Sequence, residues 1–483
     1  MNKTRAFPKV AINDIQVQAG SKPVFGGSEL SQSMDPFGRN DVDLTQVQRV
    51  VKPLGEQSLW AVLDSASEDD SLFVWRDQDA RFSFVAVGEV LRFDSQGGSR
   101  FEELQAWSSR VFEQLGSVAP ELPCVVGGFS FSEFQRSSDS CWANWQDVRF
   151  VLPEKIAYRR RLASGKYESG LILHELESEE TRREKMVFSL SQNDFSTTEP
   201  ELFVKNLQED QARFEDLVRR ALDGIGQGMF RKVVAARAAL MTPKSGYELD
   251  PVASLKTVCT GDDRSIGFAL SQPGSGMFMG LSPEVLLRVE GGRLTTHAVA
   301  GTTARGQNDA EDQEFGAALM KSAKDLHEHR LVVQGIQEAL MPLCDDLSSD
   351  PEPGLVRLTT VQHLSTAIRA RLKPDYSVLT AISRLHPTPA LCGSPTVDAL
   401  SWLAENEVFE RGWYGAPVGW LAAGGDSTFA VSIRSALLRD GLVHAFGGAG
   451  IVEGSDPASE WKETELKIAA VARLIQTREK GDA

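Results

Sequence analysis

The chain has 483 residues, of which 41% are hydrophobic and 24% are charged, as in globular proteins with a sizeable core. Its formal net charge of -16 argues against nucleic acid or an anionic membrane as a general partner, because such surfaces repel an acidic protein. Five scattered cysteines without a CxxC pair exclude a cysteine-based zinc site and favour a reducing compartment. Since the sequence shows neither a signal-peptide core nor an apolar run of about 18 residues, we expect a cytoplasmic protein without membrane contact.

Residues 1–202 are interpreted as a strand-rich N-terminal portion. The first 45 residues are polar and predict a loose arm or an edge element. Between residues 46 and 175, short apolar runs such as SFVAVG and CVVGGFSFSEF alternate with turn residues, which is typical of strands. Residues 175–201 are charged and polar, and they predict a connection to the second portion, residues 203–483. We expect both portions to belong to one composite fold.

The second portion predicts helices and hairpin strands in separate blocks. Residues 201–228 and 312–343 carry apolar side chains at helical spacing, the second range as one long helix. The segment KVVAARAAL predicts a strand, and hairpin turns are expected at Gly291-Gly292 and at Asp440. This order favours an α+β fold with antiparallel strands over a doubly wound parallel sheet.

The C-terminal stretch FGGAGIVEGSDPASEWKETELK places glycines directly before a charged helical face. Asp456 and Pro457 predict the helix start, because aspartate accepts from free N–H groups and proline suits the first helical position. Glu460, Glu463 and Lys467 are three and four residues apart and share one side of this helix. Spacing alone also fits an ordinary solvated face. The glycines weaken that interpretation because they let a ligand approach the backbone, so we expect half of an anion or metal site here.

A second acidic pair lies in the helix predicted over residues 312–343. Asp325 and Glu328 are three residues apart, and this spacing also fits an ordinary solvated helix face with neighbouring basic residues. If this face met the C-terminal one, four carboxylates would converge and would need a cation. Mg²⁺ fits such a site, because it takes oxygen ligands and keeps several waters. His327 and His329 raise zinc as an alternative, but residues two apart on a helix point away from each other.

Nine motifs follow one another along the chain: KVVAAR, GLSPEVLLRV, HAVAGTTARG, DLHEHRLVV, VQHLSTAIRARL, LHPTPALCGSP, YGAPVGW, FAVSIRSALL and GAGIVEGSDPASEWKETELK. Their order resembles that of the chorismate-utilising enzymes, and most closely that of the isochorismate synthases. The resemblance covers roughly residues 203–478, and the N-terminal portion matches only loosely through GGFSFSEF. It implies one large α+β unit, in which two twisted antiparallel sheets pack together, helices lie outside and the site lies between the sheets.

The resemblance also implies roles for single residues in a Mg²⁺-dependent conversion of chorismate to isochorismate. Water adds at C2 and the C4 hydroxyl leaves, with Lys232 as the general base and Glu284 as the general acid. The Mg²⁺ ligands implied are Glu328 and Glu463, with Asp325 and Glu460 close by or holding metal-bound waters. Substrate contacts are implied for Thr302, His363, Ala390, Tyr414, Arg434, Lys467 and the backbone near Gly448.

Three relatives within this superfamily compete. Anthranilate and aminodeoxychorismate synthases use ammonia, whereas Lys232 favours water as the nucleophile. Aminodeoxychorismate synthases also carry a lysine in a KGT motif, and this chain has Ala300 at the position of that lysine. Salicylate synthases tend to carry a hydroxyl residue at the position of Ala390, so alanine favours release of isochorismate without pyruvate elimination. A silent scaffold protein is disfavoured because the expected base, acid and metal ligands are intact. We expect no glutamine amidotransferase subunit and a monomer or weak homodimer, while the downstream pathway (menaquinone, siderophore or salicylate) stays open.

Overall fold

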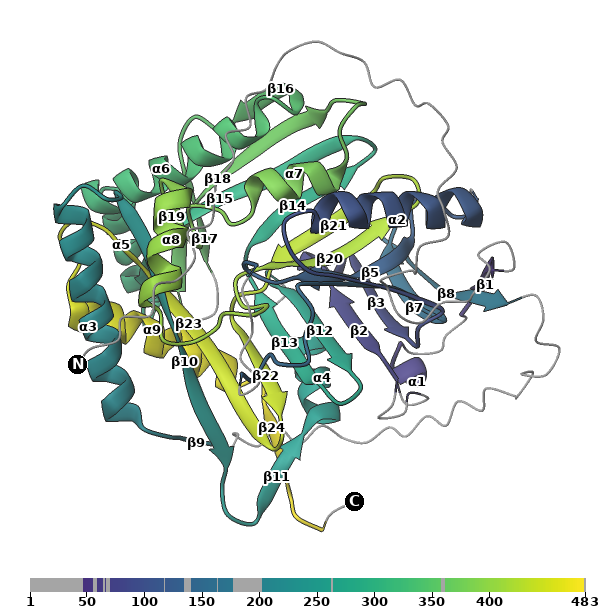
Figure 1. Ribbon diagram of the computed structural model, residues 1–483, viewed down its shortest axis with the longest axis horizontal. Coiled ribbons are helices and arrows are strands. Elements are labelled where there is room, and N and C mark those ends of the chain that lie inside the picture. The colour runs from purple at the N-terminus through teal and green to yellow at the C-terminus, as the bar shows by residue number, and fades with distance from the viewer. Residues whose placement is uncertain are drawn as a thin grey trace, which may run out of the picture. The chain divides into compact units, whose positions relative to one another are not determined.

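Antiparallel strands dominate the structure, with helices around them (Figure 1). The computed structural model describes residues 47–54, 59–63, 66, 70–116, 118–133, 140–162, 164–176, 202–261, 264–357 and 361–481. These residues belong to one compact unit, residues 39–483. The arm expected over the first 45 residues, and the connection expected over residues 175–201 except its first two, lie outside the described ranges. None of the helices in these ranges is long and apolar enough to cross a membrane.

The larger sheet has twelve strands and begins at β1. Every strand pair in it is antiparallel, and β9 joins it by pairing with β10. In spatial order its strands are β1 (Val47–Pro53), β8 (Tyr167–Leu176), β7 (Lys155–Arg161), β3 (Phe82–Val87), β2 (Leu72–Arg76), β12 (Ile266–Gln272), β13 (Gly276–Ser282), β22 (Ser435–Arg439), β23 (Leu442–Ile451), β10 (Lys232–Pro243) and β19 (Gly393–Ser394), with β9 (Leu202–Val204) beside β10.

The smaller main sheet has ten strands and is also antiparallel. In spatial order these are β16 (Cys344–Ser349), β18 (Val361–Leu372), β15 (Arg293–Ala304), β14 (Val285–Glu290), β21 (Ser427–Val431), β20 (Pro417–Ala422), β5 (Pro123–Phe129), β6 (Val148–Leu152) and β4 (Leu91–Ser95), with β17 (Gly354–Arg357) beside β18. A separate pair joins β11 (Tyr247–Asp250) to β24 (Gln476–Glu479).

The helices lie outside the two main sheets (Figure 1). Among them, α9 packs on β23, α3 packs on α9 and β10, and α6 packs on β15 and β18. Their bounds are α1 (Trp60–Leu63), α2 (Arg100–Leu115), α3 (Leu207–Gly226), α4 (Pro251–Thr260), α5 (Asp309–Leu319), α6 (Ala323–Leu340), α7 (Val378–Leu385), α8 (Thr396–Asn406) and α9 (Pro457–Ala472). The predicted α+β class with two large antiparallel sheets is therefore confirmed.

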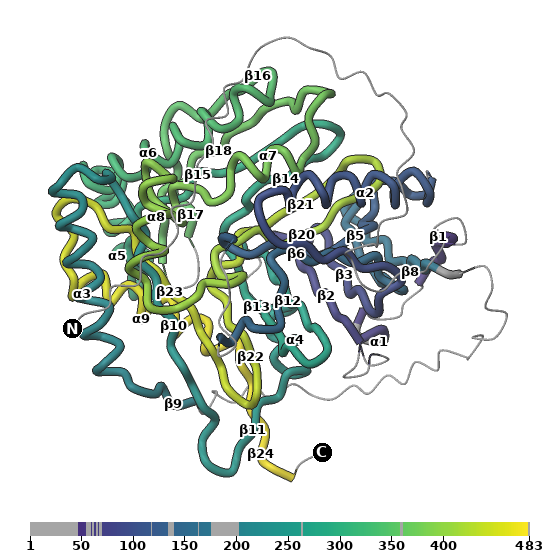
Figure 2. The backbone as a smooth tube through the Cα atoms, in the orientation of Figure 1, coloured from purple at the N-terminus to yellow at the C-terminus, as the bar shows by residue number. Residues whose placement is uncertain are grey.

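Each main sheet combines a block of strands from before residue 202 with a block of later strands, and the two blocks meet at one strand pair. In the larger sheet β2 pairs with β12, and in the smaller sheet β5 pairs with β20. Figure 2 shows the early strands β2 and β3 beside the much later β12. The N-terminal strands thus extend the same sheets that the later strands build.

The main apolar core lies between the two sheets. Along β2, Phe73 and Trp75 belong to this core, whereas Leu72 and Val74 belong to a second cluster on the opposite face, as strand alternation requires. Trp420 of β20 brings the smaller sheet into the first cluster. Helices α1, α4 and α9 contribute to the second cluster, which fixes α9 on the larger sheet.

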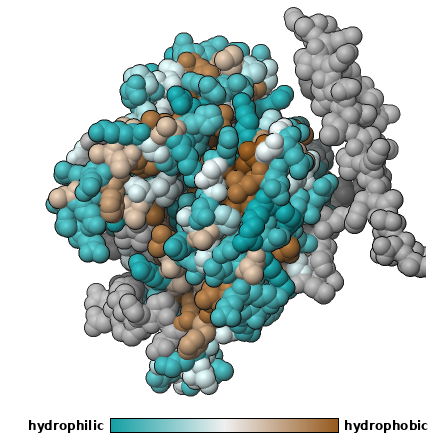
Figure 3. Space-filling model, turned by 90° about the vertical axis from the view of Figure 1, so that its left-hand side faces the viewer, coloured by the Kyte–Doolittle hydropathy of each residue, from teal (hydrophilic) through white to brown (hydrophobic). Residues whose placement is uncertain are grey.

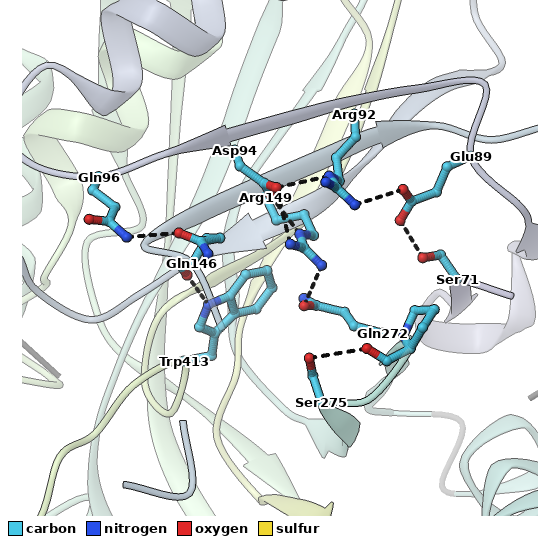
Figure 4. Close-up of polar contacts among 11 residues, drawn as sticks. Ser71, Glu89, Arg92, Asp94, Gln96, Gln146, Arg149, Gln272, Ser275 and Trp413 are labelled. Carbon is cyan, nitrogen blue, oxygen red and sulfur yellow. Dashed lines mark hydrogen bonds and ion pairs between the residues drawn. The ribbon is translucent and has the colours of Figure 1, made fainter. Parts of the chain in front are cut away.

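A polar cluster also links the two sheets (Figure 4). The Arg149 guanidinium of β6 donates to both carboxylate oxygens of Asp94 in β4, at 2.6 and 3.1 Å, and to Gln272 Oε1 of β12 at 2.5 Å. Because β12 belongs to the larger sheet, this arginine bridges both layers. A small cavity beside it is lined by apolar residues and by polar ones that include Glu89, Arg149 and Gln272, and it contains none of the predicted site residues.

Two predicted helix boundaries are wrong. The single helix expected over residues 312–343 is split into α5 and α6, because the Ser322 hydroxyl caps α6 by accepting from the Asp325 N–H at 3.3 Å. The helix expected from residue 201 begins at Leu207, because Leu202–Val204 pairs with β10 and Asn206 takes a left-handed φ of 55°. Helices α2 and α7 were not predicted.

The surface over α3, α8 and α9 is mainly hydrophilic, with scattered apolar patches (Figure 3). Helix α3 contributes ion pairs between residues four apart, including Arg219 with Glu215 and Arg220 with Asp216. Such exposed pairs add little stability, and they indicate a solvated outer face.

Candidate functional site

The predicted site residues come together where β10, β15, β18 and β23 meet α6 and α9. Lys232 is the first residue of β10, and it is almost fully buried, with its side chain 1% exposed. Its Nζ donates to Glu328 Oε1 of α6 at 2.8 Å, so the acidic face of α6 points toward this strand. The two residues are distant in sequence, and only the packing of α6 brings them into contact.

Gly450 makes this contact possible. A Cβ at Gly450 would lie 2.7 Å from Glu328 Oε1 and 3.2 Å from Lys232 Cε, so a side chain at this position would displace both groups. The approach of a ligand to this glycine-rich strand stays a prediction, and in the structure the Glu328 carboxylate lies against Gly450.

Gly450→Ala is expected to lower the activity of this site by at least about tenfold, because the added methyl would push both the Glu328 and the Lys232 side chains from their positions, and small misplacements of reacting groups are costly. Turnover and the thermal midpoint measure the effect. The matched control is Gly226→Ala at the end of α3, where a Cβ would meet nothing within 4 Å. A Gly450→Ala enzyme as active as this control would contradict the prediction.

Helix α9 carries the second acidic face and begins as predicted. The Asp456 carboxylate accepts from the Ser459 N–H at 2.9 Å, and Pro457 occupies the first helical position. Glu463 Oε1 accepts from Lys467 Nζ at 2.6 Å, and the same ammonium donates to the Gly448 carbonyl of β23 at 2.6 Å. Lys467 thus joins the helix face to the glycine-rich strand.

The carboxylates of α6 and α9 interact electrostatically. Burial raises the pKa of Glu460, and the charges of Glu463 and Glu328 raise it further, while Lys324 at 3.6 Å opposes them. Burial also acts to raise the pKa of Glu463, but Lys467, His363 and Arg434 outweigh it and hold that pKa below its usual value. Within the part of the chain that the structure describes, no three His, Cys, Asp or Glu side chains are close enough to hold a metal ion by themselves.

Asp325 stands at the first turn of α6. Its carboxylate accepts from the Ser322 hydroxyl, and its side chain lies 3.1 Å from the position of a Cβ on Gly301. Gly301 has a φ of 79°, which favours glycine, and it directly precedes Thr302. Asp325 is therefore held beside the AGT turn of β15.

Glu284 is a buried carboxyl just before β14. Burial raises its pKa to about 7, and the nearby charges of Lys232, Arg434 and Lys467 act against this rise. Its backbone is fixed, because the Glu284 carbonyl accepts from the Val431 N–H at 3.0 Å. A carboxyl with this pKa is partly protonated near neutral pH, as a general acid must be.

A polar wall comes from the paired strands β15 and β18. Thr302 Oγ1 lies 3.0 Å from His363 Nδ1, and the two residues are register partners next to an irregularity after Ala300. Burial lowers the pKa of His363 to about 3, which keeps the imidazole neutral. Among the described residues its buried Nε2 has no hydrogen-bond partner, so this nitrogen is available to a ligand.

Arg434 and Tyr414 lie on the side of the larger sheet. Arg434 has a φ of 52° between β21 and β22, and its charge acts on Glu284, Glu463 and Tyr414. Burial raises the pKa of Tyr414 to about 12, so its phenol stays protonated. A Cβ at Gly448 would lie 3.2 Å from the Tyr414 hydroxyl, which shows how closely this ring approaches β23.

Some sequence predictions find less support in the geometry. Ala390 is half-buried in the turn between α7 and β19, and none of the described polar contacts of the site includes it. Leu466 of α9 is 51% exposed, so it does not belong to the buried face of this helix. His329 Nε2 lies 2.7 Å from Thr366 Oγ1, so its ring engages β18 rather than a metal site with His327.

Arg411 and Glu407 form a buried ion pair beside β10, and neither residue was predicted to belong to the site. Their spacing of four residues at the end of an apolar helix was visible in the sequence, but such spacing is common on solvated helix surfaces.

The sequence matches the family of chorismate binding enzymes over residues 34–476, and the chain belongs to this family. It is 34% identical over 415 residues to the salicylate biosynthesis isochorismate synthase of Pseudomonas aeruginosa, which covers 82% of this chain and 84% of the relative. It is 31% identical over 418 residues to an isochorismate synthase of Bacillus subtilis, with 82% and 86% covered.

Solved structures agree with this assignment. The menaquinone-specific isochorismate synthase of Escherichia coli superposes with a TM-score of 0.72 at 27% identity, over 89% of this chain and 94% of the other. Anthranilate synthase component I of Streptococcus pneumoniae, at 20% identity and a TM-score of 0.62 over 81% and 92% of the chains, shares the fold. The predicted membership of the chorismate-utilising enzymes, with isochorismate synthases as relatives, is confirmed.

Proposed function

We propose that this chain is an isochorismate synthase, which adds water to C2 of chorismate and expels the C4 hydroxyl. The relatives named as isochorismate synthases match most of both chains. One observation carries the proposal: the buried amine of Lys232 lies close enough to the buried, partly protonated carboxyl of Glu284 for their charges to interact. Addition of water with loss of hydroxide needs such a base and such an acid.

Lys232 is the proposed base. Its Nζ donates to Glu328 Oε1 at 2.8 Å, and this contact holds the side chain in the site. The Lys232 amine is proposed to take the proton from the attacking water.

Glu284 is the proposed acid. Its carboxyl holds a proton near neutral pH because it is buried, and it donates this proton to the departing hydroxyl. Thr302 and His363 are proposed to orient the substrate from the side of β15 and β18. Arg434, Lys467, Tyr414 and the backbone near Gly448 are proposed to bind the substrate carboxylates, since they supply positive charge and hydrogen-bond donors.

Mg²⁺ is the proposed cofactor, and the donor set fits it. Glu328 and Glu463 would be the direct ligands, with Asp325 and Glu460 holding metal-bound waters, because Mg²⁺ uses few protein carboxylates. The charges of Glu463 and Glu328 raise the pKa of Glu460, and such repulsion between carboxylates supports a cation here. When bound, Mg²⁺ supplies positive charge that polarises and fixes the ring carboxylate of the substrate.

We further propose that the enzyme stops at isochorismate, works without a glutamine amidotransferase subunit and is a monomer or weak homodimer. Ala390 supports the first point, because it offers no hydroxyl to a second reaction. The proposed location is the cytoplasm, which the five free cysteines support.

The test is a product assay with purified protein, chorismate and Mg²⁺, analysed by chromatography for isochorismate, salicylate, pyruvate and anthranilate. We expect isochorismate alone, no change on adding ammonium, and loss of activity with EDTA. Salicylate with pyruvate would identify a salicylate synthase instead, and an ammonium-dependent product would identify an ammonia-using enzyme. Folded protein that forms no product would refute the proposal.

The pH profile tests Glu284. Since burial raises its pKa to about 7, the protonated form is complete well below that value and is lost as pH rises through it. We therefore expect kcat/KM to fall about tenfold per pH unit above about pH 7. Rates between about pH 5 and 9 measure this, and Glu284→Gln is expected to be slow and to lack this limb. A falling limb that persists in Glu284→Gln would assign it to another group.

A further inference from the structure

We infer that the ion pair of Arg411 and Glu407 is a positioning device that holds the Lys232 strand against the turn bearing Ala390, an inference that rests on the proposed function. Glu407 ends α8, and Arg411 follows four residues later. Their side chains are only 4% and 5% exposed. Arg411 Nε and Nη2 donate to the two Glu407 carboxylate oxygens at 2.8 and 2.6 Å, which is a bidentate pair.

The pair contacts β10 directly. Arg411 Nη2 donates to the Val234 carbonyl at 2.6 Å, and the Ala236 N–H donates to Glu407 Oε1 at 2.9 Å. Among the described strands, β19 pairs with this side of β10 only at Lys232 and Val233. The Val234 N–H still donates to the Cys392 carbonyl at 2.8 Å, and beyond this bond the ion pair contacts the Val234 carbonyl and the Ala236 N–H, so it fixes the backbone two residues from Lys232.

The same guanidinium reaches the turn after α7. Arg411 Nη1 donates to the Leu391 carbonyl at 2.8 Å, one residue after Ala390. The Arg411 carbonyl also accepts from the Tyr414 N–H at 2.9 Å, and the guanidinium lies 4.3 Å from the centre of the Phe131 ring. One side chain thereby ties together the base strand, the Ala390 turn and the Tyr414 turn.

These hydrogen bonds indicate that the Arg411–Glu407 pair positions the backbone and does not only stabilise the fold. A buried ion pair is often replaceable by apolar residues without loss of stability, so its charge is a weak stabiliser. An apolar pair, however, cannot donate to the carbonyls of Val234 and Leu391 or accept from the Ala236 N–H. Only a forked donor can serve both segments at once, and a displacement of about 1 Å at a reacting group costs about 100-fold in rate.

The test compares wild type with Arg411→Lys and Glu407→Gln. Lysine keeps the charge but has one nitrogen, so it cannot span Glu407, Val234 and Leu391 together. We expect kcat to fall at least about tenfold with KM within about twofold, because Arg434 and Lys467 bind the substrate from other elements. Amide hydrogen exchange in peptides covering residues 232–238 and 386–392 is expected to speed up at least about tenfold.

Two controls separate positioning from general destabilisation. Val85→Ala removes core contacts in β3, and Arg213→Lys alters an exposed pair with Glu209. Both are expected to leave kcat and the exchange of the two segments unchanged, although Val85→Ala lowers the thermal midpoint. If Arg411→Lys and Glu407→Gln behave like Val85→Ala, the inference is overturned. Wild type without isochorismate synthase activity would refute the proposed function, whereas the exchange measurement would still decide whether the pair holds both segments.

Discussion

Replacing Lys232 with methionine is expected to lower kcat by about 10²–10⁴-fold, the range typical for loss of a general base, while chorismate binding stays within about threefold. Methionine fills most of the buried space of Lys232 but cannot accept a proton from water. The proposed contacts to the substrate carboxylates, Arg434 and Lys467, come from other elements and remain in place. Loss in kcat without loss of binding is the mark of a group that acts in the transition state.

Initial rates with saturating Mg²⁺ give kcat, and calorimetric titration with chorismate gives Kd. Lys244→Met is the matched control, because Lys244 is exposed just beyond the end of the same strand. Lys232→Ala is a second variant that removes the amine without placing sulfur near Glu328. Rates equal to wild type in either Lys232 variant would remove this residue from the role of base.

Local sequence chemistry was sufficient for several elements of the fold. Gly291-Gly292 takes positive φ values of 55° and 77°, which are the values a tight hairpin turn demands of its central residues. Asp440, with a φ of 53°, does the same between β22 and β23. Asp456 caps α9 as expected. Each of these predictions depends on residues within one turn of chain, where preferences of single residues decide the structure.

Contacts between distant residues could not be predicted from pattern alone. The Lys232–Glu328 pair forms only because α6 packs on β15 and β18 beside the end of β10. The Arg411–Glu407 pair has the spacing of a surface pair, yet α8 and the following turn bury it against β10. The resemblance to a family pointed to Lys232 and Glu328, but it offered no signal for residues that act through the backbone of their neighbours.

Replacing Glu463 with glutamine is expected to raise the Mg²⁺ concentration for half-maximal activity by more than about 100-fold. Loss of a group that only hydrogen-bonds to a metal ligand lowers metal affinity by about 10–100-fold, so loss of a direct carboxylate ligand should lower it further. Glutamine keeps the size and one oxygen but removes the negative charge that a hard cation prefers. Activity after EDTA treatment and stepwise Mg²⁺ addition measures the shift, and calorimetric Mg²⁺ titration measures binding independently of turnover.

A variant of Lys467, the ion-pair partner of Glu463, distinguishes a metal-binding role of Glu463 from a salt-bridge role. Lys467→Met leaves the Glu463 carboxylate intact but removes its ammonium at 2.6 Å, so it is expected to raise KM for chorismate without weakening Mg²⁺ binding. Glu453→Gln, an exposed position before α9, is expected to change neither quantity. If Glu463→Gln and Lys467→Met instead gave the same rise in KM and an unchanged Mg²⁺ requirement, Glu463 would serve only to hold Lys467. Wild type that stays fully active in EDTA would exclude a role for the divalent ion. In that case Lys232, Lys324 and Lys467 alone would balance the carboxylates that repel one another across α6 and α9.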